Sequence, residues 1–412
     1  MFFHMAWRNL WRNTKRTLVL LAAILIGVWS LIFFTAFMMG MLDSMMNNAI
    51  NTLTGHIQVH AQGFRDDPVI ENVMPNAEPV EAVLERELPA GSHWTKRIRV
   101  DGVVNTARNT AGVTIVGIDP EREAGVSFFK PDALMAGEMF AADDPYAIIV
   151  GHALAEDFET DVGKKMVLMA QDADGEIASR AFRIHGVFVA ELDATEKGFV
   201  FVSVPAAREM LGLENAISEF AILLPDIEQS ESVAANISQA LQRQDPSTNY
   251  EVHTWKELLP LISAYLGNVD TYMYLWYLVV FIAMGFGIVN TILMAVLERI
   301  REFGLLKALG MKPWWIVRLV LAEALLLLVI GMAGGNILGF ASVAALAETG
   351  IDFSAFARGS EYFGMSRVVY PVVTINSVVS ANLLVFVLGA LVSVYPAVKA
   401  ARFTPVEALT HT

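Results

Sequence analysis

Four long apolar stretches constrain the fold of this sequence more than any other feature. A membrane-spanning helix needs about 20 mainly apolar residues, because each residue advances the helix by about 1.5 Å. The stretches that meet this length are Leu18–Leu42, Thr271–Leu297, Leu319–Ala347 and Val368–Val398. The chain is 55% hydrophobic and only 17% charged, which departs from ordinary soluble chains in the direction expected for a protein in lipid. The sequence therefore predicts an α-helical membrane protein with four transmembrane helices.

Basic residues predict how these helices are oriented, because lysine and arginine concentrate in short cytoplasmic segments. The segment before the first stretch contains Arg8, Arg12, Lys15 and Arg16 and no acidic residue. This basic start resembles that of a signal peptide, but the apolar run is longer than a signal peptide's and no small-residue cleavage site follows. The loop between the second and third stretches contains Arg299, Arg301, Lys307, Lys312 and Arg318. We expect a retained first helix and both termini in the cytoplasm of a bacterial cell, at its inner membrane.

The spacing of the four stretches is one helix, a long polar region and three further helices. The predicted divisions are a cytoplasmic amphipathic segment 1–16, helices 17–42, 271–297, 314–347 and 368–398, a periplasmic domain 43–270, a cytoplasmic coupling segment 298–313, a periplasmic loop 348–367 and a cytoplasmic tail 399–412. Within 43–270, 16 lysines and arginines face 36 aspartates and glutamates, so this region alone has a net charge of −20. The chain as a whole, at −14, offers no basic stripe for a nucleic-acid partner.

The region 43–270 has the pattern of a large α+β extracytoplasmic domain. Strands are predicted at 56–60 and 96–104 around a helix at 79–88, and again at 217–224 and 250–253 around a helix at 230–243. This order, interrupted in the middle, predicts a split ferredoxin-like porter module with a strand-rich insertion at about 120–213. Within the insertion, a hairpin at 165–189 is predicted to turn at Asp172–Glu176.

Few residues outside the membrane have the pattern of a chemical site. The chain has no cysteine, which excludes disulfides, thiolate metal sites and a cysteine nucleophile. His56 and His60 share one strand face, but no further ligand lies at zinc spacing, and a structural role is favoured. The acidic turn at Asp172 lacks the distal glutamate of a calcium loop and is better explained as a solvated hairpin turn. We therefore expect no catalytic residue and no metal site.

The segment after the second stretch is the most informative part of the chain. Glu298 and Arg299 end the stretch, and Gly310 before Pro313 provides a helix stop and a return to the bilayer. Between them, Ile300, Phe303, Leu306 and Leu309 recur at near-helical intervals, so one face is predicted to be apolar and the opposite face charged. Such a helix at the cytoplasmic surface can transmit displacement from a soluble partner. A plain interfacial reversal of the chain is the alternative.

Three motifs resemble those of FtsX-like, MacB-type ABC transporter permeases. They are AWRNLWRN at 6–13, NTILMAVLER at 290–299 followed by REFGLLKALGM at 301–311, and YPAVKAARFTPVEAL at 395–409. With the one-plus-three helix layout, the resemblance covers nearly the whole chain, and the layout is similar to that of lipoprotein-releasing Lol permeases. The family places the ATPase-coupling helix at the second motif. The residues there are Glu298, Arg299, Arg301, Glu302, Phe303, Leu305, Leu306, Lys307, Leu309 and Gly310.

The resemblance implies a non-catalytic permease with several partners. The sequence contains no G-x-x-x-x-G-K-[ST] phosphate loop, so ATP and Mg²⁺ are expected on a separate cytoplasmic ATPase dimer, with no cofactor on this chain. A second permease subunit, identical or homologous, a phospholipid membrane and a periplasmic carrier or lipoprotein are the other expected partners. The implied function is extraction or export of a lipoprotein or amphiphile. The alternative within the family is a mechanotransmitter that regulates a periplasmic cell-wall hydrolase.

Two sets of membrane residues are candidates for substrate contact and helix packing. Flexible methionines beside aromatic rings make an adaptable surface for acyl chains, although an interfacial aromatic belt explains the same residues equally well. The candidate substrate-cavity residues are Phe33, Phe37, Met38, Met41, Met273, Tyr274 and Tyr277. In the third stretch, Gly331, Gly335 and Gly339 recur every four residues, a pattern typical of close helix contact.

Overall fold

The computed structural model describes residues 7–8, 14–246, 248–353 and 366–403. These residues form two compact units. The membrane unit comprises Met1–Asp43, Leu266–Asp352 and Val368–Thr412, and the outer unit comprises Ser44–Tyr265 and Phe353–Arg367. Parts of the AWRNLWRN motif and of the C-terminal motif, with Arg12, lie outside the described residues.

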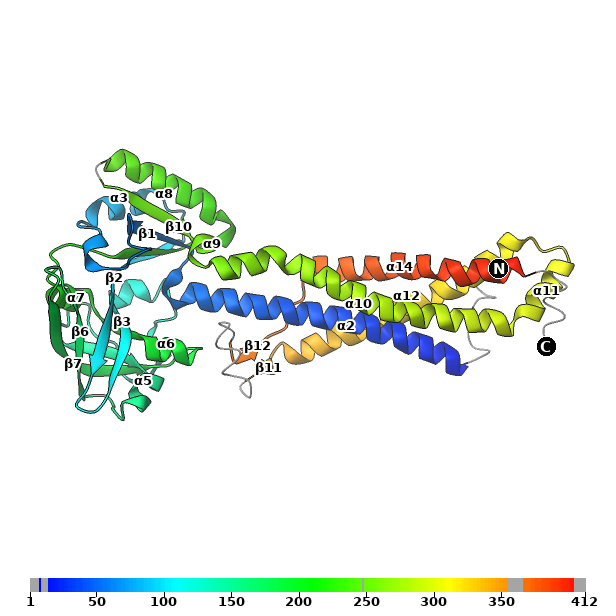
Figure 1. The fold of residues 1–412 in the computed structure, drawn as a ribbon, viewed down its shortest axis with the longest axis horizontal. Helices are drawn as coiled ribbons and strands as arrows, with labels where there is room; N and C mark the ends of the chain where they lie inside the picture. Colours follow the sequence, from blue (N-terminus) through cyan, green and yellow to red (C-terminus); the bar gives the residue numbers. More distant parts are fainter. Residues whose placement is uncertain (1–6, 9–13, 247, 354–365, 404–412) are drawn as a thin grey trace. The chain divides into compact units, whose positions relative to one another are not determined.

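Among the described residues, four helices are long and apolar enough to cross a membrane, as predicted. They are α2 (Thr14–Ala49), α10 (Pro260–Glu298), α12 (Pro313–Leu346) and α14 (Ile375–Arg402). A shorter helix, α11 (Ile300–Ala308), follows α10 and precedes α12 (Figure 1). α2 and α10 both continue beyond the predicted spans, because residues on their outer sides keep helical geometry after the apolar pattern ends.

The fourth transmembrane helix begins later than the sequence predicts. Val368–Val369 form the strand β12, which pairs antiparallel with β11 (Ile351–Asp352), and the helix starts only at Ile375. Pro371 explains the delay, because proline has no N–H to donate and restricts the residue before it to extended conformations. This extended segment contacts α2, where the Val372 N–H donates to the Ala36 carbonyl at 2.9 Å. Hydropathy counted these residues as part of the span, although their backbone is not helical.

Polar side chains connect the helices of the membrane unit. Asn336 of α12 and Asn382 of α14 form a reciprocal amide pair, with N–O distances of 2.7 and 2.9 Å. The Trp29 indole of α2 donates to the Ser342 hydroxyl of α12 at 3.1 Å. Such hydrogen bonds add a directional contribution where apolar packing alone does not distinguish helices from lipid.

The first part of the outer unit is a four-stranded antiparallel sheet. Its strands are β1 (Ile57–Ala61), β2 (His93–Asn105), β9 (Glu219–Leu223) and β10 (Tyr250–Thr254), in the order β10-β1-β9-β2. The helices α3 (Glu78–Glu87) and α8 (Ser230–Gln244) lie side by side and bury apolar residues against it (Figure 1). The connectivity strand-helix-strand, twice, with this strand order is the ferredoxin-like arrangement that the sequence predicted. We call this part the porter module.

The second part of the outer unit is a ring of paired strands. β2 continues past the porter sheet and pairs with β3 (Thr110–Ile118) and β6 (Lys165–Gln171). The ring continues from β3 through β8 (Phe199–Ser203), β5 (Ala147–Gly151) and β7 (Ile177–Phe188), which pairs with β6 and with the short β4 (Leu134–Gly137). Its helices are α4 (Pro120–Glu123), α5 (His152–Asp157), α6 (Asp193–Gly198) and α7 (Val204–Leu211). We call this part the insertion module.

The insertion module therefore begins before residue 120, where the sequence placed its start. β3 and the second half of β2 belong to its ring, and local alternation could not tell which partners these strands choose. The hairpin of β6 and β7 turns where predicted. There, Asp172 Oδ1 accepts hydrogen bonds from the N–H groups of Asp174 and Glu176, both at 3.0 Å, and Gly175 has φ +81°. The Asp172 carboxylate thus stabilises the backbone of the hairpin turn.

Candidate functional site

The helix α11 is bounded by two breaks in the backbone. Arg299, between α10 and α11, leaves helical geometry at φ −104° and ψ 14°. At the other end, Gly310 has φ +93°, and the Met311 N–H donates to the Leu306 carbonyl at 3.0 Å. A left-handed glycine after the last turn satisfies the otherwise unpaired carbonyls of a helix end. Pro313 then begins α12, at a helix position where its missing N–H costs nothing.

The two faces of α11 have different surroundings. Ile300, Phe303 and Gly304 are buried, and Phe303 belongs to the apolar core of the membrane unit. The exposed residues are Arg301, Leu305, Ala308 and Leu309, which follow one another at intervals of four, three and one and so form a single helical face. Leu305 and Leu309 are 56% and 78% exposed. We call Arg301, Leu305, Ala308 and Leu309 the exposed face of α11.

This arrangement corrects the predicted position of one leucine, Leu309. Leu309 was expected on the apolar face with Phe303, but six residues of helix rotate it well away from that direction, and it is exposed. Leu306 packs against the apolar core, as its predicted place on the apolar face requires, and is only partly exposed. The near-helical spacing of apolar residues did not show that Leu306 packs against the core whereas Leu309 is exposed at the surface.

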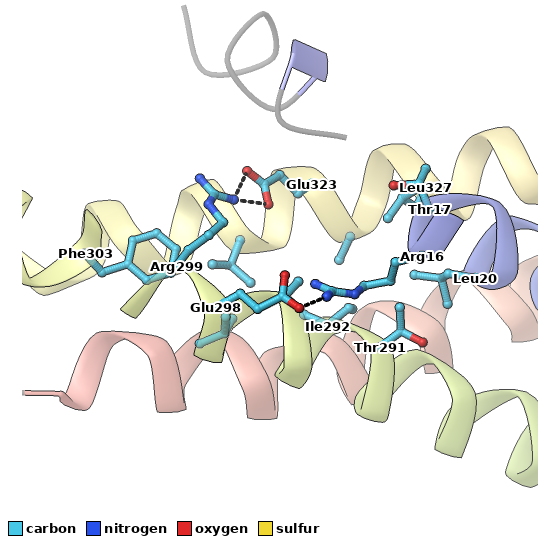
Figure 2. A pocket seen from close by; sticks show the side chains of 14 residues that line it. Arg16, Thr17, Leu20, Thr291, Ile292, Glu298, Arg299, Phe303, Glu323 and Leu327 are labelled. Carbon is cyan, nitrogen blue, oxygen red and sulfur yellow. Dashed lines mark hydrogen bonds and ion pairs between the residues drawn. The ribbon is translucent and has the colours of Figure 1, made fainter. Parts of the chain in front are cut away.

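Ion pairs and hydrogen bonds hold α11 and the end of α10 to the neighbouring helices, and Figure 2 shows two of the ion pairs. Arg299 Nη1 donates to both carboxylate oxygens of Glu323 in α12 at 2.9 Å, and its Nε donates to Glu302 at 3.1 Å. Glu298 pairs with Arg16 of α2. Lys307 donates to the carbonyl oxygens of Ala401 and Phe403 at the end of α14. α11 is therefore linked to α12 and α14, and the last residue of α10 is linked to α2.

A cavity of about 100 Å³ lies beside these ion pairs, among α2, α10 and α12. Arg16, Glu298, Arg299 and Glu323 supply its charged lining, and Thr17, Leu20 and Ile292 are among its other side chains (Figure 2). The sequence analysis did not identify Glu323 as the partner of Arg299, or Arg16 as the partner of Glu298. The available signal was the opposite charge of residues expected at one membrane surface, because such charges rarely stay unpaired there.

The candidate substrate-cavity residues differ in how far they are buried. Met273 and Tyr277 are buried within the helix bundle, whereas Tyr274 is largely exposed. The Tyr277 hydroxyl contacts the Thr35 hydroxyl of α2 at 3.0 Å, and Trp276 stacks on Phe34 with ring centroids 4.4 Å apart. α2 and α10 are therefore in direct contact at this level. The remaining four candidates, Phe33, Phe37, Met38 and Met41, are partly buried along α2.

The glycines of α12 lie against α2. A Cβ atom on Gly331 would lie 2.6 Å from Ile24 Cγ2, one on Gly335 would lie 2.7 Å from Val28 Cβ, and one on Gly339 would lie 3.0 Å from Ile32 Cγ2. Separations this short leave no room for a side chain. The stripe thus allows the backbones of α12 and α2 to approach closely.

His56, just before β1, and His60, within it, both have hydrogen-bond partners. The His56 Nδ1 atom accepts from the Leu224 N–H at 3.0 Å, and His60 Nε2 contacts Gln58 Oε1 at 2.9 Å. Among the described residues, no group of three or more histidine or acidic side chains is placed to hold a metal ion.

Two family models match this chain. Residues 17–240 match the MacB-like periplasmic core domain, and residues 274–405 match the FtsX-like permease C-terminal region. The lipoprotein-releasing system transmembrane protein LolC of Xylella fastidiosa is 24% identical over 316 residues, which are 72% of each chain. An uncharacterized ABC transporter permease of Methanocaldococcus jannaschii is 23% identical over 274 residues, which are 66% of this chain and 64% of that protein. The match thus covers less than two thirds of the archaeal relative.

Among solved structures, the periplasmic region of MacB from Actinobacillus actinomycetemcomitans is similar to this chain at 11% identity. The alignment covers 52% of this chain and 94% of that one, with a TM-score of 0.38. A macrolide export ATP-binding/permease protein, MacB of Marinobacter nauticus, is 23% identical over 210 residues, 51% of this chain and 30% of that protein.

Proposed function

Because the chain belongs to the family of FtsX-like permeases with a MacB-like periplasmic core domain, we propose that it couples ATP hydrolysis by a separate subunit to work on a lipoprotein or amphiphile. The chain is a non-catalytic, multi-pass ABC transporter permease with a periplasmic-type domain between its first and second spans. The proposal places it in a bacterial inner membrane, with α11 and both termini in the cytoplasm. An ATPase dimer and a second permease subunit complete the assembly, and the substrate is extracted from the membrane.

The exposed face of α11 carries this proposal. Its apolar residues Leu305 and Leu309 are accessible on a short helix whose opposite face is fixed by Phe303 and by the ion pairs of Arg299. Exposed apolar side chains on a rigidly held helix are suited to a complementary groove in a soluble partner. Because Arg299 pairs with α12 and Lys307 binds the end of α14, displacement of α11 reaches those spans directly.

The substrate class rests on a second set of observations. LolC of Xylella fastidiosa, which matches over 72% of this chain, is a component of a lipoprotein-releasing system by name. The outer ends of α2 and α10 carry aromatic and methionine side chains, which adapt to acyl chains. Separation of α2 from α10 at the contact of Thr35 with Tyr277 would expose these residues to a lipid anchor.

The coupling role is tested by charge substitution on the exposed face. Leu305→Glu with Leu309→Glu should weaken binding of the cognate ATPase by about tenfold or more, because an interface that buries unpaired carboxylates is strongly disfavoured. The fold should persist, because both side chains are exposed. The measurements are ATPase co-purification and ATP hydrolysis in nanodiscs. Ile177→Glu, which changes a 74% exposed residue in the outer unit, is the matched control.

The substrate role requires a separate measurement. Release of a lipidated protein from proteoliposomes should depend on the ATPase and should fail in the double leucine variant. Normal ATPase binding by that variant would remove α11 as the coupling site. Normal coupling without any release of lipidated protein, together with activation of a co-purifying cell-wall hydrolase, would favour the regulatory alternative.

A further inference from the structure

A buried ion-pair cluster lies within the outer unit and includes the segment that follows α2. Its centre is Arg97 of β2, whose side chain is fully buried. Arg97 Nε and Nη2 donate to the two carboxylate oxygens of Glu123 at 2.9 and 2.7 Å, and Nη1 donates to Glu219 at 2.9 Å. Nη1 also donates to the backbone carbonyl of Leu53. The two carboxylates are themselves no more than 1% exposed.

The three partners of Arg97 come from three different parts of the chain. Leu53 lies in the short π-helical segment Ile50–Thr54 that continues α2, although its own backbone is not helical. Glu123 belongs to α4 of the insertion module, and Glu219 to β9 of the porter module. One guanidinium group therefore joins the end of the first span to both modules of the outer unit.

Leu53 is itself held in an unusual conformation. Its φ is +68°, which is rare for a branched side chain, and it is buried within the aromatic core of the insertion module beside Phe129 and Phe201. Its carbonyl oxygen accepts from Arg97 and, at 3.2 Å, from Gln58 of the porter module. Backbone strain of this kind persists only where the surroundings fix it. The end of α2 is thus positioned by contacts from both modules.

Electrostatics explain why an arginine occupies this place. The Leu53 carbonyl and the two carboxylates present three oxygen acceptors, two of them charged, and hydrogen bonds from a cation to such acceptors are the stronger ones. The planar fork of arginine can serve three acceptors at once, whereas the compact ammonium of lysine cannot match this geometry. Arg99 lies 3.9 Å from the second oxygen of Glu219, so two arginines balance two carboxylates. Burial raises the pKa of Glu219, but Arg97, Arg99 and His60 together hold that pKa below its ordinary value.

We propose that Arg97 is a positioning residue that joins the end of the first span to the porter and insertion modules, so that both follow a displacement of α2 together. This inference rests on the proposed function, because it names the place where such a displacement enters the outer unit. Loss of the Arg97 guanidinium group makes the positions of both modules relative to Leu53 more variable. Loss of one carboxylate has this effect only on the module that supplies that carboxylate. The remaining hydrogen bonds, including that from the Phe128 N–H to the Asn51 carbonyl at 3.0 Å, keep the modules attached.

The absence of cysteine allows a direct test by spin labelling of the full-length protein. One label is placed at Asn51→Cys and a second at either Ala235→Cys in the porter module or Ile177→Cys in the insertion module. All three positions are exposed. Pulsed electron resonance then measures the distance distribution of each pair in nanodiscs without nucleotide.

Three substitutions have different expected effects on these two pairs. Arg97→Lys should broaden both distributions. Glu123→Gln should broaden only the pair to Ile177→Cys, and Glu219→Gln only the pair to Ala235→Cys. Arg180→Lys is the matched control: Arg180 pairs with Glu209 within the insertion module, and neither distribution should change. Thermal unfolding verifies that each variant is folded.

The result that overturns the proposal is a folded Arg97→Lys protein with both distributions as narrow as in the parent. Equal broadening of both distance distributions by Glu123→Gln would likewise contradict the proposal. A residue that only stabilises the fold would affect both modules, whereas the proposal requires Glu123→Gln to affect the insertion module alone. In each glutamine variant, Arg97 keeps its ion pair with the glutamate that is not substituted. If the lysine variant does not fold, the distances measured in these two variants test the proposal. These distances need no ATPase. A failure of the proposed coupling would be detected in a different measurement. In that case, the spin-label distances in the parent protein would not change when nucleotide is added with the ATPase bound.

Discussion

The side chains of Gln58, His60, Arg97 and Glu219 lie on the porter sheet away from α3 and α8, and all four are buried. His60 stacks on Phe64 and lies across the strand pair from Glu219. Burial lowers the pKa of His60 below its ordinary value of 6.5; Glu219 opposes this effect, and His253 and Arg99 add to it. Burial likewise lowers the pKa of His56, which Asp226 opposes. Both imidazoles are therefore favoured in their neutral form in the folded chain.

These pKa shifts predict that the protein loses stability in mild acid. Below about pH 6.5 the unfolded chain binds more protons than the folded chain, so the free energy of unfolding falls as the pH falls. The melting temperature should therefore drop between about pH 7.5 and about pH 5.5, and the drop should be smaller in His60→Gln. Glu219 does not contribute in this window, because a lowered carboxyl pKa affects stability only at lower pH. An equal drop in the parent and the variant would contradict the assignment to His60.

The packing of α12 on α2 depends on residues without side chains. Gly331, Gly335 and Gly339 face α2, while the amide pair of Asn336 and Asn382 connects α12 to α14. One helix is thus fixed by close backbone approach on one side and by hydrogen bonds on another. Dispersion contacts of this kind require short distances, because the attraction weakens steeply as a gap opens.

We predict that Gly335→Leu destabilises the membrane unit by about 1–3 kcal/mol, the usual cost of overpacking a filled core. A Cβ atom there would lie 2.8 Å from the Leu25 carbonyl oxygen, and backbone cannot move aside as a flexible side chain can. Gly287→Ala is the control, because its Cβ would lie 3.9 Å from Ala23, an ordinary contact. Thermal unfolding in nanodiscs measures both. A Gly335→Leu protein that melts with the parent would show that α2 and α12 are not closely packed in the membrane.

The outer unit, one of the two compact units of the chain, has its own apolar core. Residues of the loop between α12 and α14 belong to this unit as well. Ser366 accepts a hydrogen bond from Asn48 at 2.9 Å, and Arg367 pairs with Asp193 of α6. A self-contained core joined to the membrane by a few chain crossings has the properties of an independent domain.

We therefore expect residues 45–268 to fold when expressed without the membrane helices and to unfold in one cooperative transition, followed by circular dichroism. A shorter fragment, residues 106–216, should not fold, because it lacks β2 and its ring of strands cannot close. Gradual unfolding of the longer fragment would contradict the boundary between the units. Cooperative unfolding of the shorter one would show that β2 is dispensable for the insertion module.

The sequence by itself determined the four spans, the one-plus-three layout and the breaks on either side of α11. These features depend on local properties: the mean hydropathy of a run, a glycine in the left-handed region at Gly310, and a proline at Pro313. The porter module was also predictable, because its two strand-helix-strand units each have a clear period. Pairing between the two units then follows from the need to bury both helices on one sheet.

Only the tertiary structure decided the features that depend on distant residues. Periodicity did not show that β2 serves two sheets, that Leu309 faces outward while Leu306 faces the core, or that Val368 pairs in a strand before α14 begins. Nor could it identify Arg97, which looks like any basic residue in an alternating strand. Its partners lie 26, 44 and 122 positions away, so its burial becomes favourable only when the chain brings three acceptors together.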